Sequence, residues 1–227
     1  PVLTLTFNRP AARNALTWSM YEGLERACED VDADDSIRVF VLRGAGQAFV
    51  AGTDISQFSR FTSRDDAIQY ERRLAGSIDR VERVNLPTIA QVHGVAAGGG
   101  CAIALACDLR VCTPDAKFGI PVARTLGNCL SAANYARILD LIGPAKTKEM
   151  MFTGRLFHAG EGPRLGLVTK MAEGTSIDRV VRELAADLAG NAPLTIRATK
   201  EAVRRIQERR RLALPAMDAL IALCYLS

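Results

Sequence analysis

The chain has 227 residues, of which 29 are basic and 25 acidic, so its net charge at neutral pH is +4. Apolar residues make up 48% and charged residues 24%, proportions typical of folded globular proteins, which disfavours intrinsic disorder. The most apolar stretch, residues 92–107, contains His93 and four glycines and is shorter than the ~20 residues that a membrane-spanning helix needs. The composition therefore predicts an ordinary folded protein without a transmembrane helix.

The positions of the cysteines and histidines indicate the cellular compartment of the protein and whether it binds a metal. No two cysteines form a C-x-x-C pair, and His93 and His158 lie far apart, without cysteines or carboxylates at ligand spacing. We expect reduced, mostly buried cysteines, a cytoplasmic location and no metal site. No secretion signal is predicted, because no cationic start precedes an apolar segment. The cysteines are Cys28, Cys101, Cys107, Cys112, Cys129 and Cys224.

Hydrophobic patterning predicts strands that alternate with helices over the first 170 residues or so. Thr17 is typical of the N-cap of a first helix, and helices alone follow in the C-terminal third. This order favours an α/β core with crossover connections, residues 1–175, and a helical extension, residues 176–227. The strands are predicted at 2–7, 38–42, 87–92, 109–112 and 167–172, and the later helices at 65–84, 131–142, 144–151, 176–190, 194–211 and 215–225.

Two segments would bring backbone N–H groups to a site, namely Phe49–Ser56 after the second strand and His93–Ala102 after the third. Three consecutive glycines before a helix leave the first N–H groups unshielded, and the helix dipole adds to their attraction for negative charge. The pattern therefore favours an anion or oxyanion site, with close packing of the helix on a strand as the alternative. Neither a phosphate-binding loop of the Walker type nor a dinucleotide-binding glycine pattern is present.

Five segments, taken in order, resemble the crotonase (enoyl-CoA hydratase/isomerase) superfamily from nearly one end of the chain to the other. The resemblance implies an α/β fold, a spiral of repeated strand-turn-helix units with a C-terminal helical trimerisation region. It also implies a homotrimer or a dimer of trimers. The matching segments are Asn8–Leu16, Phe49–Phe58, Pro87–Asp108, Lys117–Pro121, and Phe152–Phe157 with Gly166–Val168.

The resemblance also implies an acyl-CoA substrate and an enolate-like thioester intermediate, with no cofactor because coenzyme A is part of the substrate. On this resemblance the backbone N–H groups of Thr53 and Gly99 form the oxyanion hole. The substrate-binding positions would be Arg13, Ala15, Ala51, Gly52, Asp54, Ile55, Ala97, Gly98 and Val122.

The chain departs from the hydratases of this superfamily at the two glutamates that activate water. Ala102 stands at one position and Val122 at the other, and no Asp or Glu occurs between residues 85 and 107 or between 116 and 139. Each such group contributes about 10²- to 10⁴-fold to catalysis, so simple hydration is expected to be severely impaired. Isomerisation, decarboxylation or C–C cleavage of an acyl-CoA that carries its own carboxylate fits better. A non-catalytic protein that binds CoA thioesters is the alternative.

The segment after Val122 is expected to face the acyl pocket and to offer replacements. Arg124 could bind a substrate carboxylate, while Asn128, Cys129 or Ser131 could donate hydrogen bonds or relay a proton. Structural roles are the alternatives, with Cys129 as a small buried side chain and Asn128 as a helix cap or turn residue.

Acidic residues on the helix at 65–84 are further candidates. Asp65, Asp66 and Glu71 could act as acids, but a solvated helix start is the interpretation that the sequence favours. His93 is expected to be structural, and neither histidine is expected to be the base.

Residues 197–211 carry seven basic side chains against Glu201 and Glu208. A solvated helix face is the first interpretation, and a footprint for CoA phosphates is the second. A nucleic-acid partner is not expected, because no aromatic residues lie among these charges for base stacking. The chain is expected to lack a last helix that its relatives have.

Overall fold

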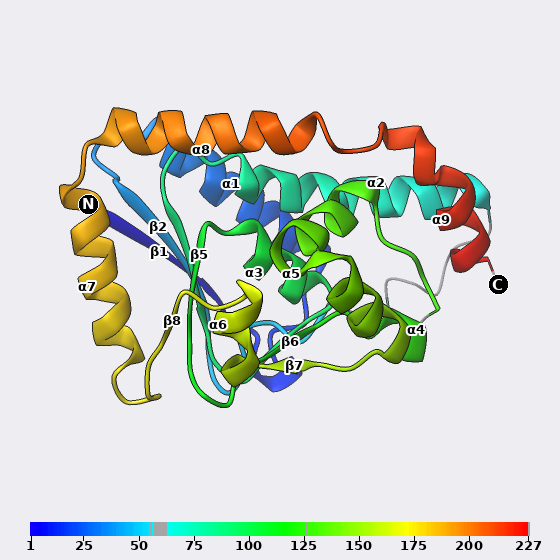
Figure 1. Cartoon of the computed structure of the whole chain (residues 1–227), viewed down its shortest axis with the longest axis horizontal. Helices are drawn as coiled ribbons and strands as arrows, with labels where there is room; N and C mark the ends of the chain where they lie inside the picture. The colour runs from blue at the N-terminus through cyan, green and yellow to red at the C-terminus, as the bar shows by residue number, and fades with distance from the viewer. Residues whose placement is uncertain (55, 57–62, 126, 227) are drawn as a thin grey trace.

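The computed structural model describes residues 1–54, 56, 63–125 and 127–226 (Figure 1). Its centre is a five-stranded sheet in the order β1-β2-β3-β5-β8, in which every neighbouring pair is parallel. The last strand is shorter than the predicted strand at 167–172, and the other four lie where the sequence predicts them. The strands are β1 (Val2–Phe7), β2 (Val39–Gly44), β3 (Thr88–Val92), β5 (Leu109–Cys112) and β8 (Lys170–Met171).

A second sheet has three short strands, β4 (Val95–Ala97), β6 (Lys117–Gly119) and β7 (Phe157–His158). Strand β4 runs parallel to β6, and β7 runs antiparallel to it. The sequence predicts none of the three, because two or three residues are too few to show alternation. The predicted third strand therefore does not lead directly into the glycine-rich turn, since β4 lies between them.

The helices follow the predicted order with a few changes of boundary. The helices predicted at 131–142 and 144–151 share the label α5, but the non-helical backbone of Gly143, with φ of 70° and ψ of 170°, divides them at the predicted junction. Gly162 and Pro163 do not prevent a short helix from forming at residues 162–165. Pro163 lies in the first turn of this helix, where a missing N–H costs little stability. The helices are α1 (Trp18–Ala33), α2 (Arg64–Glu82), α3 (Gly99–Ala106), α4 (Val122–Thr125), α5 (Ala132–Thr153), α6 (Gly162–Leu165), α7 (Ile177–Gly190), α8 (Pro193–Glu208) and α9 (Asp218–Tyr225).

Alternation along β2 explains how the sheet acquires two covered faces. Phe40 and Leu42 join the main core with residues of α1, α2 and α3. Val39 and Val41 point to the opposite face, where they pack with residues of α7 such as Val181. A parallel strand that is buried on both faces has a continuous apolar sequence, as β2 does.

Helix α8 runs along one edge of the molecule, with α7 at one end of this edge and α9 at the other (Figure 1). Helix α8 spans from α7 toward α9, and α9 packs against α2. Five of the seven basic residues in 197–211 form ion pairs within the described part of the chain, namely Lys200, Arg204, Arg205, Arg210 and Arg211. The expected solvated face holds for Arg205 and Arg210, but the side chains of the other three are only 11–18% exposed. The domain boundary at residue 175 stays a prediction.

Five of the six cysteines, all but Cys224, are buried free thiols, as expected. A cytoplasmic location stays a prediction. Among the described residues, no helix combines the length and the apolar character required to cross a membrane. The same residues contain no cluster of three or more His, Cys, Asp or Glu side chains that could hold a metal ion.

Candidate active site

Two stretches of backbone clamp the segment that follows β2. Leu16 donates its N–H to the carbonyl of Gly52 at 2.8 Å, and Asp54 donates back to Leu16 at 2.9 Å. On the other side Ala97 donates to the carbonyl of Val50 at 3.0 Å. These bonds bring together the positions at which the sequence predicts a site: Arg13, Ala15, Ala51, Gly52, Thr53, Asp54, Ala97, Gly98 and Gly99.

The three glycines have different roles. Gly98, with φ of 50°, turns the chain into α3 through a conformation that L side chains rarely adopt. A Cβ at Gly99 would collide with the hydroxyl of Tyr21 and lie 2.8 Å from Oγ1 of Thr53. A Cβ at Gly100 would collide with the carbonyl of Val50, so close packing accounts for this third glycine.

The backbone N–H groups of Thr53 and Gly99 have no hydrogen-bond partner among the described residues. Within the described residues, neither Thr53 N–H nor Gly99 N–H donates a hydrogen bond to a backbone carbonyl or to a side chain. The hydroxyl of Thr53 lies 2.8 Å from that of Tyr21, which fixes the side chain. Unpaired N–H groups near a helix N-terminus are able to bind an oxyanion.

A cavity of about 170 Å³ adjoins these two N–H groups. Its lining comes from the loop after β2 and from α2, α3, α4 and α9. Ala102 and Val122, where the superfamily resemblance leads one to expect glutamates, contribute apolar surface. The sequence-predicted residues in the lining are Ala51, Gly52, Thr53, Ala97, Gly98, Gly99, Val122 and Asn128.

Glu71 of α2 also lines this cavity, and only 1% of it is exposed. Its Oε1 accepts a 2.7 Å hydrogen bond from the backbone N–H of Ser131, and its Oε2 accepts one of 2.9 Å from the hydroxyl of Tyr225. Burial raises the pKa of Glu71 to about 7, and these two hydrogen bonds limit the rise. The expectation that Glu71 belongs to a solvated helix start is therefore wrong. Asp65, in contrast, is exposed in the first turn, as expected.

Glu71 could have been found from its helical spacing. Ala67, Leu74, Ile78 and Val81 lie on the same buried face of α2, at intervals of three and four residues from Glu71 or from one another. A carboxylate in the middle of an apolar stripe is the available signal, and only a buried partner or a function explains it.

Tyr225 completes the polar end of the cavity, and the sequence analysis did not identify it. Asn128 donates from Nδ2 to the tyrosine oxygen at 3.1 Å, while its own Oδ1 is buried without a hydrogen-bond partner among the described residues. Burial, together with the charge of Glu71, raises the pKa of Tyr225, so the phenol stays protonated. The predicted presence of Asn128 in the pocket agrees with this arrangement.

Arg124 was expected to face the pocket, and its placement contradicts this. On the short helix α4, Val122 and Thr125 face the cavity, as residues three apart do. Arg124 is exposed, and its aliphatic stem lies against Gly154.

Other candidates also lie outside the cavity. Cys129 is buried, with its sulfur 3.8 Å from the hydroxyl of Tyr135, and it packs as a small apolar residue. The hydroxyl of Ser131 caps α5, so this residue reaches the site only through the N–H that it gives to Glu71.

The predicted CoA-binding positions differ in their surroundings. Arg13 is exposed, and Asp54 forms an ion pair with Arg9 at 2.7 Å. Ile55 lies outside the described residues. His93 contacts the carbonyl of Gly46 at 2.9 Å, in agreement with its expected structural role.

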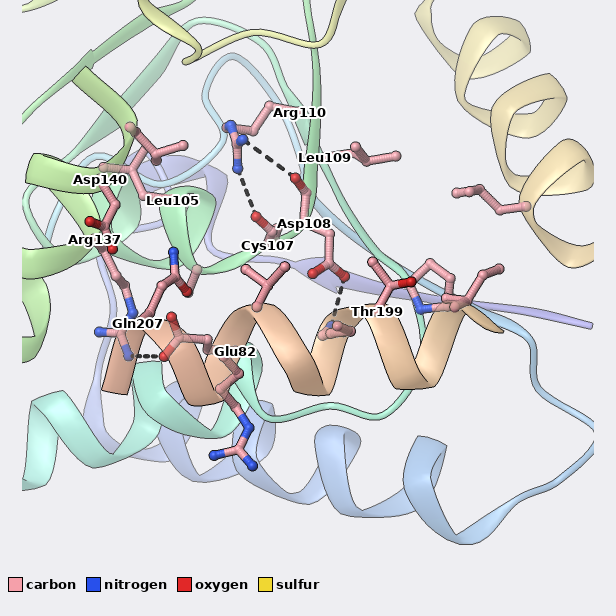
Figure 2. A pocket seen from close by; sticks show the side chains of 18 of the residues that line it. Glu82, Leu105, Cys107, Asp108, Leu109, Arg110, Arg137, Asp140, Thr199 and Gln207 are labelled. Atoms are coloured by element: carbon pink, nitrogen blue, oxygen red, sulfur yellow. Dashed lines mark hydrogen bonds and ion pairs between the residues drawn. The ribbon is translucent and has the colours of Figure 1, made fainter. Parts of the chain in front are cut away.

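A larger cavity of about 440 Å³ lies between α8 and the core (Figure 2). Its charged groups are already paired: Asp108 with Lys200, and Glu82 with Arg137 and Arg211. Figure 2 shows Arg110 directed at the carbonyls of Cys107 and Asp108, which follow α3. Since every acid in the described lining of this cavity, namely Glu82, Asp108 and Asp140, forms an ion pair, the smaller cavity is the better candidate for acid–base chemistry.

Comparison with known proteins places the chain in a family. A family model described as "Enoyl-CoA hydratase/isomerase" matches residues 1–220. The "Short-chain-enoyl-CoA hydratase" of Clostridium acetobutylicum is 33% identical over 210 residues, which cover 90% of this chain and 78% of the relative. The "2,3-dehydroadipyl-CoA hydratase" of Escherichia coli is 33% identical over 215 residues, covering 91% and 80%.

Solved structures agree with this assignment. A crystal structure described as an "enoyl-CoA hydratase/ carnithine racemase" from Magnetospirillum magneticum superposes with a TM-score of 0.86 at 32% identity, covering 96% of this chain and 82% of that one. A "probable ENOYL-COA Hydratase" from Mycobacterium smegmatis also has a TM-score of 0.86 at 32% identity, covering 99% and 88%. The predicted crotonase-like α/β fold is confirmed. The chain belongs to the enoyl-CoA hydratase/isomerase family.

Proposed function

We propose that the protein is an enzyme that binds an acyl-CoA thioester and stabilises an enolate-like intermediate through the N–H groups of Thr53 and Gly99. The observation that carries the proposal is that these two N–H groups have no partner among the described residues and adjoin one buried cavity. Donors fixed in a site that excludes water stabilise developing negative charge strongly, each by about 2.7–4 kcal/mol.

The substrate class follows from the family. The relatives named above act, by their names, on enoyl-CoA and 2,3-dehydroadipyl-CoA thioesters. We assign the acyl group to the 170 Å³ cavity and the coenzyme A portion to the surface formed by Arg13, Ala15 and residues 51–55. Coenzyme A arrives with the substrate, so the proposal needs no separate cofactor.

The apolar wall of the cavity limits which reactions the protein can catalyse. Ala102 and Val122 offer no carboxylate, so we expect crotonyl-CoA to be a poor substrate for hydration. Isomerisation, decarboxylation or C–C cleavage of an acyl-CoA needs the oxyanion site but not a second carboxylate for water. A turnover number comparable to that of an efficient hydratase with crotonyl-CoA would contradict this.

A second candidate function is binding of CoA thioesters without turnover. The same two apolar positions favour it, because a protein that only binds needs no acid–base pair. A panel of enoyl-, malonyl- and β-keto-CoA thioesters distinguishes the two. Binding without any product or any exchange of α-protons would support the second candidate.

The N–H of Gly99 is best tested in a Tyr21→Phe background, which removes the nearer of the two hydroxyls that a Cβ at position 99 would meet; that of Thr53, at 2.8 Å, is common to both variants. Gly99→Ala and Gly99→Pro then add the same Cβ, but only proline removes the N–H. We expect the proline variant to turn over acyl-CoA about 10²- to 10³-fold more slowly than the alanine variant. Equal rates in the two variants would contradict the proposed role of this N–H.

We also propose a homotrimer or a dimer of trimers. Exposed apolar side chains on α8 and α9 support assembly through the C-terminal helices, because such side chains gain stability when another subunit covers them. They include Leu194, Val203, Ile206, Leu220 and Leu223. Light scattering coupled to size-exclusion chromatography tests the stoichiometry, and a monomer at micromolar concentration would contradict it.

A further inference from the structure

We propose that Glu71 removes and returns a proton at the α-carbon of the bound thioester, held in position by Tyr225 and Asn128. The inference rests on the proposed function and names the acid–base group that the function needs. It places this group on α2, rather than on α3 or after β6, where Ala102 and Val122 stand.

Position is the first argument. Glu71, Thr53 and Gly99 line one cavity, and Glu71 is the only carboxylate in its described lining. Ala102 and Val122, which also line the cavity, have no polar side chains. An acyl group in this cavity therefore has one carboxylate beside it.

The second argument is that Glu71 makes a poor structural residue. No arginine, lysine or histidine in the described chain forms an ion pair with it, and its neighbours Arg72 and Arg73 pair with Asp218 and Glu22. A buried carboxyl group without a cation costs stability, which a glutamine or an apolar residue would avoid. Such cost is typical of functional sites.

The hydrogen bonds orient the carboxylate and leave it able to react. Oε1 accepts from Ser131 N–H, and Oε2 accepts from the hydroxyl of Tyr225, which is itself held by Asn128. Each carboxylate oxygen has a second lone pair, so one proton can still be accepted. Tyr225 and Asn128 are thus positioning residues.

The groups around Glu71 keep its proton available near neutral pH. They are Tyr21 on α1, Tyr70 on α2, Tyr225 on α9 and Cys129 before α5, while α3 presents Ala102. Burial raises the pKa of each tyrosine and of the thiol, so all four are neutral at pH 7. Desolvation therefore dominates and raises the pKa of Glu71 to about 7, close to the optimum for a general acid or base.

The proton transfer balances without a further reactant. The ionised carboxylate of Glu71 takes a proton from the α-carbon, and the electron pair of that C–H bond moves into the enolate. The enolate oxygen accepts hydrogen bonds from Thr53 and Gly99. Return of the proton, or of a deuteron acquired from solvent, regenerates the thioester and the carboxylate.

The experiment follows deuterium incorporation into butyryl-CoA in D2O by mass spectrometry, with calorimetry for binding. Wild type is compared with Glu71→Gln and with Glu29→Gln, which removes an exposed carboxylate on α1. We expect Glu71→Gln to bind butyryl-CoA within threefold of wild type and to exchange its α-protons at least about 10²-fold more slowly. Glu29→Gln should match wild type in both measurements.

A pH profile adds a readout that a purely structural role would not affect. Wild-type exchange should rise as the pH increases through about 7, as Glu71 loses its proton. Tyr225→Phe removes a hydrogen bond that favours the ionised form, so the midpoint should move to higher pH. If Glu71→Gln does not fold, Tyr225→Phe alone tests the inference. A pH midpoint of exchange equal to that of wild type in Tyr225→Phe would contradict it.

The possible results distinguish a failure of the role proposed for Glu71 from a failure of the proposed function. Exchange by wild type and by Glu71→Gln at equal rates would overturn the role of Glu71 and leave the oxyanion site standing. Binding of butyryl-CoA by wild type without any exchange would overturn both.

Discussion

The hydroxyl of Tyr225 donates a 2.9 Å hydrogen bond to Oε2 of Glu71, which lies 154 residues earlier in the chain. The bond joins α9 to α2 and closes the polar end of the cavity that adjoins Thr53 and Gly99. Both the protonation of Glu71 and the packing of the C-terminal helix therefore depend on this contact.

Tyr225→Phe should raise the pKa of Glu71 above about 7, because the lost hydrogen bond stabilises the carboxylate more than the neutral acid. The measurement is a ¹³C NMR titration of glutamate carboxyl groups, with Glu71→Gln used to assign the resonance. Tyr135→Phe is the matched control, since Tyr135 contacts Cys129 and should leave the titration unchanged. A titration at or below the wild-type value in Tyr225→Phe would contradict the network.

Glu71→Gln should stabilise the protein at neutral and higher pH. The folded-state pKa of Glu71 is raised from its ordinary 4.5 to about 7, so the stability tied to its proton is fully present below pH 4.5. That stability is lost as the pH rises through about 7, because the unfolded chain gives up its proton earlier. Glutamine has no such proton to lose.

Urea unfolding at pH 4 and pH 8 checks this. We expect the variant to exceed wild type by roughly 1–3 kcal/mol at pH 8 and to differ little at pH 4. A variant that is less stable than wild type at both pH values would assign Glu71 a structural role.

Much of the fold could be predicted from the sequence, because β1, β2, β3 and the long helices carry clear patterns. Strands β4, β6 and β7 could not, since two or three residues in a strand depend on their partners. The backbone part of the site could also be predicted, because glycines and their neighbours carry a local signal around Gly98.

The side-chain part of the site depends on contacts between residues that are distant in the sequence. Glu71 interrupts the apolar stripe of α2, but its partners Ser131 and Tyr225 are 60 and 154 residues away, so the sequence does not show what it contacts. Arg124 was misplaced for a related reason, since only the orientation of α4 determines which of its residues faces the cavity.

Gly100→Ala should destabilise the protein by about 1–3 kcal/mol, because the new Cβ would lie 2.5 Å from Cβ of Val50 and closer still to its carbonyl oxygen. Gly76 on α2 is the matched control, since a Cβ there meets nothing within 4 Å. Gly76→Ala should stabilise the helix by about 0.4–1 kcal/mol. Thermal unfolding of both variants tests the difference, and equal effects would show that Gly100 does not pack as described.

Lowering the pH should weaken the ion pair by which Arg211, in the segment after α8, binds Glu82 of α2. Burial would raise the pKa of Glu82, but hydrogen bonds and charges from Arg211 and Arg137 outweigh this and lower it to about 2. The stability from this carboxylate is therefore present above pH 4.5 and is lost as the pH falls toward 2.

Urea unfolding between pH 5 and pH 2.5 in wild type and Arg211→Gln measures this effect. The loss of stability on acidification should be smaller in the variant, because the pKa of Glu82 is then less depressed. An equal loss in both proteins would mean that the Arg211 pair contributes nothing.

The most direct test of the account is a crystal structure with a bound, slowly reacting acyl-CoA. We predict that the thioester oxygen lies about 2.7–3.1 Å from both Thr53 N and Gly99 N, with the α-carbon beside the carboxylate of Glu71. A thioester bound elsewhere, for instance in the larger cavity under α8, or an α-carbon turned away from Glu71, would contradict it.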